Sequence, residues 1–281
     1  MSIRYLRHLG DLISRGINNV IERGPDRTFL LLVRYVSWKL RFQNRISRLP
    51  PRANLAVTRI VLAWVRVSIK TLRYLFPNKY TDADPYAVRH VKTDKITHVS
   101  NLEGTKRRGW VMDGNWDQNV DRFLDRPIPN SIEQHFSNGV NWEETALADE
   151  YDDTEQFQQK CEYIEQLHEQ IVTQGFQCQR ELLITDPEAA WSGVNTTISP
   201  VTNEITVDVG RNGEVLFNML GKHRLSIAKV TGVEKVPVMV SCRHTDWQRI
   251  RELDQYENAE GKEGHPDLID LYNESQAPSQ T

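Results

Sequence analysis

The sequence predicts an α+β protein in which a helical N-terminal region precedes a mixed-sheet body. Residues 1–77 show helical periodicity, and a second helical pattern covers residues 153–175. Residues 204–220 and 235–244 contain short apolar or alternating runs, which are typical of strands. The 281 residues are enough for one or two domains with a full hydrophobic core.

Composition divides the chain into three parts. Residues 1–77 form a basic amphipathic helical region with fifteen Lys or Arg and three acids, so its net charge is +12 and the remainder carries −15. Residues 78–250 are expected to form the body, with a long insertion at about 100–152. Residues 251–281 are polar and acidic, which predicts a disordered tail. A basic region beside an acidic body favours contact of the basic region with an anionic surface.

The basic region is expected to form three helices, at residues 2–23, 27–48 and 53–76, with Pro50-Pro51 separating the last two. Arginines recur every seven residues, which is about two helical turns, so each set lies on one narrow stripe. The stripes are Arg27, Arg34, Arg41 and Arg48 in the second helix, and Arg52, Arg59, Arg66 and Arg73, with Lys70 nearby, in the third.

The third helix is apolar apart from its cations, which predicts contact with an anionic membrane surface through residues 27–76. Arg59 and Arg66 would oppose a transmembrane position by roughly 5–7 kcal/mol together. A helix in the interface suits the sequence better, with Trp64 and Tyr74 at headgroup depth. One alternative is a bundle whose apolar faces pack on each other. Another is DNA binding, which explains the charge but not the wide apolar faces.

The cysteines predict the cellular compartment. Cys161, Cys178 and Cys242 lack the spacing of a metal site or a disulfide framework, so reduced thiols are expected. Residues 1–20 lack the continuous apolar segment of a secretory signal. The sequence therefore predicts a cytoplasmic protein, peripheral at the inner face of the membrane.

The body is expected to alternate strands with helices. A strand begins near Tyr86 and reaches a turn before Ile96, and the helix at 153–175 ends at Gly175. The remaining expected elements are a strand at 181–184, strands at 204–210 and 214–220 joined by the turn Arg211-Asn212-Gly213, a helix at 222–232, and a final strand at 235–244.

This order resembles the ParB N-terminal/sulfiredoxin-like fold superfamily over about residues 87–245. The most specific part is GKHRLSIAKVTGVEKVPVMV at 221–240, and TDKI at 93–96 and GFQCQRELL at 175–183 are weaker similarities. The resemblance implies a small mixed-sheet domain with an insertion and a nucleotide, ATP or CTP, at the G-x-x-R turn. Sulfiredoxin carries its nucleophilic cysteine directly after that glycine, whereas this chain has Lys222, so sulfiredoxin activity is not implied.

Physical chemistry independently predicts an anion site at this turn. A glycine lets backbone amides approach a phosphate closely, and the start of the following helix presents unpaired N–H groups. Three cations at a helix N-terminus are unfavourable unless an anion lies among them. The alternative is that these side chains face water or pair with acids of the body. The predicted nucleotide contacts are Gly221, Lys222, His223, Arg224, Gln179 and Arg180.

The insertion pairs tryptophans with acids. Trp110 lies near Asp113, Trp116 adjoins Asp117, and Trp142 precedes two glutamates. Such a segment could line a pocket in which Asp113 and Asp117 hold Mg²⁺, and Asp117 and His223 act as catalytic residues. The alternative is that the tryptophans anchor the core.

These observations predict a nucleotide-binding protein that acts as a kinase-like phosphotransferase on a lipid or small hydroxyl substrate at a membrane surface. Catalysis of phosphoryl transfer is mostly positioning and charge stabilisation, which cations and Mg²⁺ could supply. The alternatives are a non-enzymatic, nucleotide-responsive membrane adaptor and a DNA-binding relative of ParB.

Overall fold

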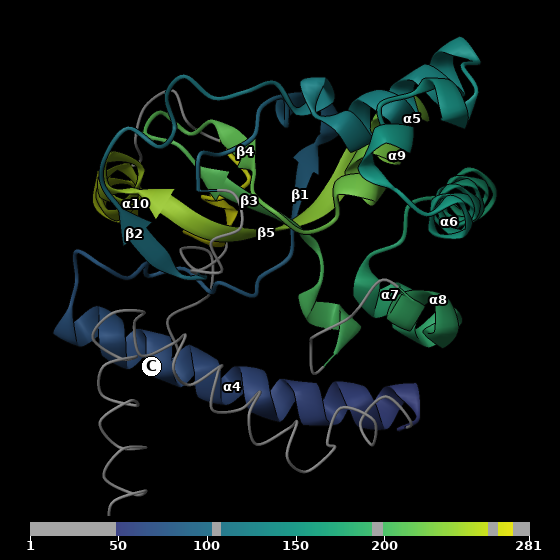
Figure 1. Cartoon of the computed structure of the whole chain (residues 1–281). Coiled ribbons are helices and arrows are strands. Elements are labelled where there is room, and N and C mark those ends of the chain that lie inside the picture. Colours follow the sequence, from purple (N-terminus) through teal and green to yellow (C-terminus); the bar gives the residue numbers. More distant parts are fainter. Residues whose placement is uncertain (1–48, 103–107, 193–198, 258–263, 272–281) are drawn as a thin grey trace, which may run out of the picture.

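Figure 1 shows the computed structural model, which describes residues 49–102, 108–192, 199–257 and 264–271 as an α+β fold around a five-stranded mixed sheet. The predicted helices at 2–23 and 27–48 lie outside the described residues. The strands are β1 (Arg89–Lys92), β2 (Trp110–Met112), β3 (Ile205–Val209), β4 (Val215–Phe217) and β5 (Lys235–His244). The helices are α4 (Pro51–Leu75), α5 (Pro127–Asn138), α6 (Thr154–Gln174), α7 (Gln179–Thr185), α8 (Pro187–Ser192), α9 (Lys222–Val230) and α10 (Thr245–Glu257).

Strand β5 is the centre of the sheet. It pairs with β1 in the antiparallel sense and with β2 in the parallel sense along one edge, and with β3 in the parallel sense along the other. Strand β4 is antiparallel to β3, with Val209 opposite Val215 across the predicted turn at 211–213. The predicted strands at 204–210, 214–220 and 235–244 are confirmed.

Alternation along β5 directs successive side chains to two different layers. Val236, Val238 and Val240 belong to the main core, which includes Leu225 and Ala228 of α9. Met239 lies instead in a second cluster, with residues of α4. Helices α9, α5 and α6 therefore stack on one face of the sheet, and α4 lies against the other (Figure 1).

Helix α4 confirms the third predicted helix. It begins at Pro51, a position where the missing N–H of proline is not needed. Arg66 Nε donates to Asp84 Oδ2 at 2.7 Å, and Arg73 pairs with Glu252, so the C-terminal half of the predicted stripe joins α4 to the body. Within the described part of the chain, no helix combines the length and apolar character needed to span a membrane.

The predicted strand at 181–184 is wrong, because these residues lie in helix α7. Two adjacent leucines suit either a buried strand or a short helix, and a local contact decides between them. The Glu181 carboxylate accepts the Cys178 N–H at 2.9 Å, which caps the first turn of α7. Leu182 and Leu183 then pack in a cluster that includes Ala190 of α8.

The insertion at 100–152 contributes to the core. It supplies β2 to the sheet and α5 to the layer that covers α9. Trp116 and Trp142 are both buried, and the Trp142 indole donates to Glu165 Oε1 at 3.0 Å and stacks on His135. These two tryptophans are therefore part of the core, as the alternative interpretation of the insertion expected.

The predicted disorder of residues 251–281 is wrong for residues 251–257 and 264–271. Residues 251–257 continue α10, and Leu268 is completely buried in the main core. The sequence pattern missed this segment because its apolar residues are few and lie between polar stretches.

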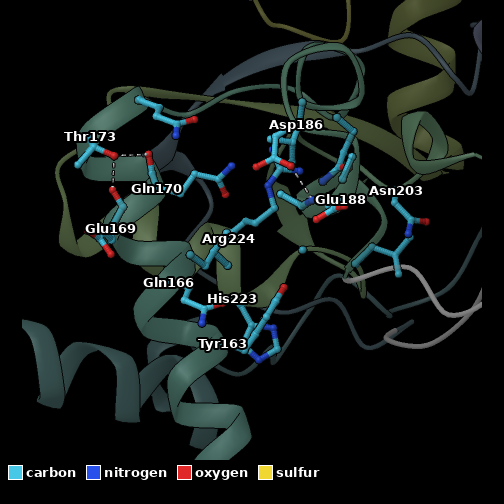
Figure 2. A pocket seen from close by; sticks show the side chains of 18 residues that line it. Tyr163, Gln166, Glu169, Gln170, Thr173, Asp186, Glu188, Asn203, His223 and Arg224 are labelled. Atoms are coloured by element: carbon cyan, nitrogen blue, oxygen red, sulfur yellow. Dashed lines mark hydrogen bonds between the residues drawn. The ribbon is translucent and has the colours of Figure 1, made fainter. Parts of the chain in front are cut away.

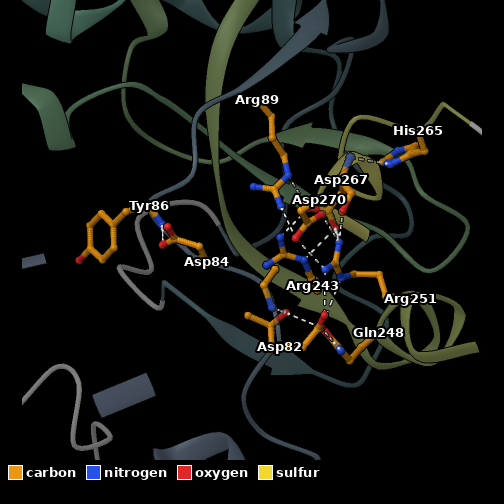
Figure 3. A network of polar contacts seen from close by, with 12 residues as sticks. Asp82, Asp84, Tyr86, Arg89, Arg243, Gln248, Arg251, His265, Asp267 and Asp270 are labelled. Carbon is orange, nitrogen blue, oxygen red and sulfur yellow. Dashed lines mark hydrogen bonds and ion pairs between the residues drawn. The ribbon is translucent and has the colours of Figure 1, made fainter. Parts of the chain in front are cut away.

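Figure 3 shows what fixes this segment: Asp267 and Asp270 lie among Arg89, Arg243 and Arg251, which come from β1, β5 and α10. Asp267 Oδ2 accepts from Arg243 Nε at 2.7 Å and from the indole of the core residue Trp247 at 2.9 Å. Arg89 Nε lies 3.2 Å from Asp267 Oδ1. Arg89 and Arg243 thus obtain a counter-charge from the C-terminal segment, whereas Arg251 pairs with Asp82 as well as with Asp270.

Candidate functional site

A cleft of about 640 Å³ lies between α6 on one side and α7 and α8 on the other, and the start of α9 borders it. In Figure 2, Gln166, Glu169 and Gln170 project from α6, while Asp186 and Glu188 lie on the opposite side. A volume of this size is within the range of small-molecule sites. The described residues that line it include four sequence-predicted site residues: Gln179, Gly221, His223 and Arg224.

The first turn of α9 borders this cleft, and its backbone N–H groups precede the helical hydrogen-bond ladder. The first intrahelical bond runs from the Leu225 N–H to the Gly221 carbonyl at 2.9 Å, so the amides of residues 222–224 precede the regular ladder. No side chain caps this end among the described residues. The start of this helix therefore presents backbone donors of the kind that suit an anion, and anion binding there stays a prediction.

Gly221 itself has a packing role. Its φ of 83° lies in the left-handed region, and a Cβ placed there would lie 2.7 Å from Ile205 Cγ1 and 3.0 Å from Ile205 Cα. The glycine therefore allows α9 to begin directly against β3. Close approach of the backbone to the neighbouring strand is enough to explain the glycine at this position.

Three buried polar atoms at the cleft have no hydrogen-bond partner among the described residues. They are Gln179 Oε1, Asn203 Oδ1 and His223 Nε2. The Gln179 side chain is more than nine-tenths buried, at 7% exposure. A buried polar atom without a partner costs about 1–3 kcal/mol, so three of them beside one helix terminus make this cleft a candidate ligand site.

Arg224 holds the site together instead of presenting a free charge. Its Nη1 donates to Glu204 Oε2 at 3.1 Å and its Nη2 to the Gln177 carbonyl at 2.5 Å, while the guanidinium lies over the Phe176 ring. The other oxygen of Glu204 accepts the Gln179 N–H at the start of α7. Arg224 and Glu204 thereby fix α7 to α9, and the positive charge predicted for a phosphate is already neutralised by a carboxylate.

His223 is neutral at physiological pH. Burial lowers the pKa of its imidazole to about 3, and the nearby cations Lys160 and Lys222 act in the same direction. The ring lies edge-on to Tyr163 at 5.8 Å between centroids. A neutral imidazole can donate or accept a single hydrogen bond at Nε2, but it adds no positive charge to the cleft.

The other predicted nucleotide contacts lie outside the cleft. Lys222 is exposed and borders a smaller cavity of about 190 Å³ that Pro127 and Phe217 also line. Arg180 is exposed on α7. Neither side chain is among the residues that line the cleft beside Gln179 and His223.

Asp117, the predicted catalytic base and metal ligand, lies at the opposite end of β3. It contacts Gly210, whereas Gly221 contacts Ile205, so the two ends are roughly 16 Å apart at the rise of a strand. Both Asp117 oxygens accept from the Arg211 side chain, at 2.8 and 2.9 Å, and Oδ2 also accepts the Arg211 N–H. Asp117 therefore fixes the β3–β4 turn.

Asp113 and Asp117 are not arranged as a metal pair. The Asp113 side chain is 90% exposed, while that of Asp117 is 2% exposed and engaged by Arg211. Across the described ranges, no group of three or more His, Cys, Asp or Glu is placed to hold a metal ion.

Replacement of Asp117 with asparagine is expected to lower the free energy of unfolding at pH 7 by about 1–3 kcal/mol. Burial alone would raise the pKa of this carboxyl, but the Arg211 hydrogen bonds outweigh it and lower the pKa to about 2, from 3.8. The ionised group therefore contributes stability above pH 3.8, and the difference between wild type and variant should diminish as the pH falls towards 2. Urea unfolding of both proteins across this range measures it. A difference that does not change with pH would contradict the assignment.

Sequence reasoning missed several residues of the cleft. Asn203 and the carboxylates of Glu169, Asp186 and Glu188 lie in segments without a recognisable motif, and only the folded arrangement brings them to one place. The rim is consequently acidic and rich in amides. The acids and amide oxygens of the rim favour a ligand with hydrogen-bond donors, whereas the start of α9 favours an anionic group on the same ligand.

Comparisons of the chain with protein-family models, with curated proteins and with solved structures gave no match. Membership of the ParB N-terminal/sulfiredoxin-like superfamily therefore stays a prediction from the sequence.

Proposed function

We propose that this protein binds a nucleotide, ATP or CTP, in the cleft between α6, α7 and α9. One observation carries the proposal: Gln179 Oε1 and Asn203 Oδ1 lie in the same cleft as the first turn of α9, and none of the described residues supplies a partner to these two acceptors or a side-chain cap to this turn. The helix start suits a phosphate, and the two acceptors suit donors elsewhere on the same molecule.

The chemistry of the acceptors favours particular bases. Adenine and cytosine each carry an exocyclic amino group, which can donate to an amide oxygen, whereas uracil presents carbonyl oxygens at the equivalent edge. Ribose hydroxyls can donate to the second acceptor. A base that places a carbonyl against Gln179 Oε1 would leave both atoms unsatisfied, which is strongly unfavourable in a buried site.

The acidic rim of the cleft favours binding of the nucleotide together with Mg²⁺. Asp186 and Glu188 would repel a free triphosphate, but Mg²⁺ commonly bridges phosphate oxygens to one or two carboxylates. These two residues would take the role that the sequence predicted for Asp113 and Asp117. The chemistry that the ion would supply is neutralisation of charge between rim and phosphates.

Nucleotide binding predicts a selective thermal shift. CTP with Mg²⁺, at about 100 times its dissociation constant, should stabilise the protein by about 2.7 kcal/mol. UTP is the matched control ligand, and it should bind about tenfold more weakly or worse. Equal shifts by CTP and UTP would contradict base recognition, and no shift with any nucleotide would contradict the proposal.

A pair of variants localises the effect. Gln179→Leu removes the buried acceptor without changing the backbone, and it should abolish the preference for CTP over UTP. Gln158→Leu is the same change at an exposed position of α6 away from the cleft, and it should leave binding unchanged. If both variants bind as wild type, the ligand does not lie against Gln179.

Kinase-like phosphoryl transfer to a lipid or small hydroxyl substrate is a second candidate function, and the position of Asp186 favours it. This partly buried carboxylate lies within the cleft and could orient an acceptor hydroxyl, as Asp117 cannot. Magnesium-dependent turnover that Asp186→Asn abolishes would support transfer. Binding without turnover would support the alternative, a nucleotide-responsive adaptor.

A further inference from the structure

The outward side of α4 carries an apolar surface that the rest of the described chain does not cover. Trp64 is 66% exposed and Tyr74 is 87% exposed. The other large apolar residues of this surface, which we call the α4 outer face, are Ile60, Val67 and Leu75, and the exposed Phe76 directly follows the helix. Figure 1 shows α4 running along the bottom of the body in this view, with the sheet above it.

The periodicity of α4 separates its cations into two sets. Arg66 and Arg73 bond to Asp84 and Glu252 of the body. Arg52, Arg59 and Lys70 are exposed, and at 100° per residue they fall along one edge of the apolar face. The helix sequence contains no acidic residue, so the face and its edge are apolar and positive.

The positive charge along the α4 outer face indicates which kind of surface would cover it. A second copy of the chain would bring the same cations together, and like charges oppose such a contact. Residues 1–48 contain ten Lys or Arg and three acids, so they are not the electrostatic complement either. An anionic lipid surface complements the α4 outer face, because the apolar side chains can be buried among the acyl chains and the cations can pair with headgroup phosphates.

We propose that the α4 outer face lies in the interface of an anionic phospholipid bilayer, with the helix axis parallel to the membrane. Trp64 and Tyr74 are amphipathic rings of the type that is enriched at headgroup depth. The buried side of α4 remains packed on Tyr86 and Met239, so the body stays on the aqueous side. This inference is independent of nucleotide binding.

Vesicle sedimentation with the full chain tests the proposal. The protein should bind vesicles that contain phosphatidylglycerol and bind much less to pure phosphatidylcholine. Arg59→Gln and Lys70→Gln should each weaken binding by about fivefold, since one cation contributes roughly that factor near an anionic surface. Arg180→Gln, at an exposed position of α7, should have no effect. Absence of binding to anionic vesicles would overturn the proposal.

A depth measurement separates α4 from residues 1–48, which are also basic. A spin label at Val67→Cys, in a Cys178→Ser background, should become accessible to oxygen and protected from an aqueous relaxation agent when anionic vesicles are added. The same label at Val172→Cys, equally exposed on α6, should stay aqueous. Binding in which the label at 67 stays aqueous would overturn the proposal in favour of another segment. Immobilisation of that label without vesicles would overturn it in favour of a protein partner.

Discussion

Replacement of Asp267 with alanine is expected to lower the free energy of unfolding by about 3–5 kcal/mol, because it leaves buried guanidinium groups short of negative charge. Asp267 lies within 3.2 Å of Arg89 and is hydrogen bonded to Arg243 and to the Trp247 indole. Arg89, Arg243 and Trp247 are all buried, so water cannot replace the carboxylate without opening the core.

Urea unfolding at neutral pH measures this loss. Asp113→Ala is the matched control, because that side chain is 90% exposed, and it should change stability by no more than about 0.5 kcal/mol. Burial would raise the pKa of Asp267, but Arg243, Arg251 and Arg89 hold it well below the usual range. The stabilising contribution is therefore complete above the ordinary pKa of an aspartate and is lost as the pH falls below it. A loss of less than about 1 kcal/mol in Asp267→Ala would show that the arginines find other partners.

Gly221→Ala should destabilise the protein by about 2–5 kcal/mol through two separable effects. The left-handed backbone costs an L-residue roughly 1–2 kcal/mol. The added Cβ would also lie 2.7 Å from Ile205 Cγ1 and 3.0 Å from Ile205 Cα, and overpacking of this kind costs about 1–3 kcal/mol. Because the strand backbone is one of the obstacles, a change of side-chain rotamer cannot relieve the contact.

Gly232→Ala isolates the first effect. Gly232 has a φ of 72°, but nothing lies within 4 Å of the position of its Cβ, so only the backbone cost of roughly 1–2 kcal/mol is expected. Chemical denaturation of the two variants gives the difference that belongs to the contact with Ile205. Equal losses in the two variants would contradict a tight approach of α9 to β3.

The elements that the sequence predicted best are those with a strong local signal. The final strand was predicted at 235–244, and β5 has the same bounds, because its apolar run is long and is bounded by turn residues. Asp153 caps α6 by accepting the N–H groups of Glu155 and Gln156, and Gly175 follows its last residue, so both ends were readable. The α+β class follows from these elements.

The misassigned elements depend on contacts between distant residues. Leu182 and Leu183 are compatible with a strand until the Glu181 carboxylate caps the turn before them. Residues 264–271 have a polar composition, and only the arginines of β1, β5 and α10 make their aspartates part of the core. Charge pairing over such separations leaves no periodic signal in the sequence.

The candidate site was predictable in part. Gly221, His223 and Gln179 were predicted and do border one cleft, because a glycine followed by a helix has a recognisable local pattern. The pairing of Arg224 with Glu204, and of Asp117 with Arg211, could not be read, because each joins segments that fold together only in three dimensions. A charge visible in a sequence is free for a ligand only if no carboxylate reaches it.

The three arginines beside Asp267 also bear on the order in which the chain can assemble. Arg89 lies in β1, the first strand of the sheet, whereas its carboxylate partner Asp267 follows the last strand and α10. Contacts between such distant residues slow folding, because a large loop must close before they form. During synthesis, a nascent chain that has not yet added residue 267 carries Arg89 and Arg243, whose guanidinium groups are costly to bury without a counter-ion. The pairing of β1 with β5 should therefore become stable only after residues 264–271 have left the ribosome. Chains that end before residue 267 should be more readily cleaved by proteases.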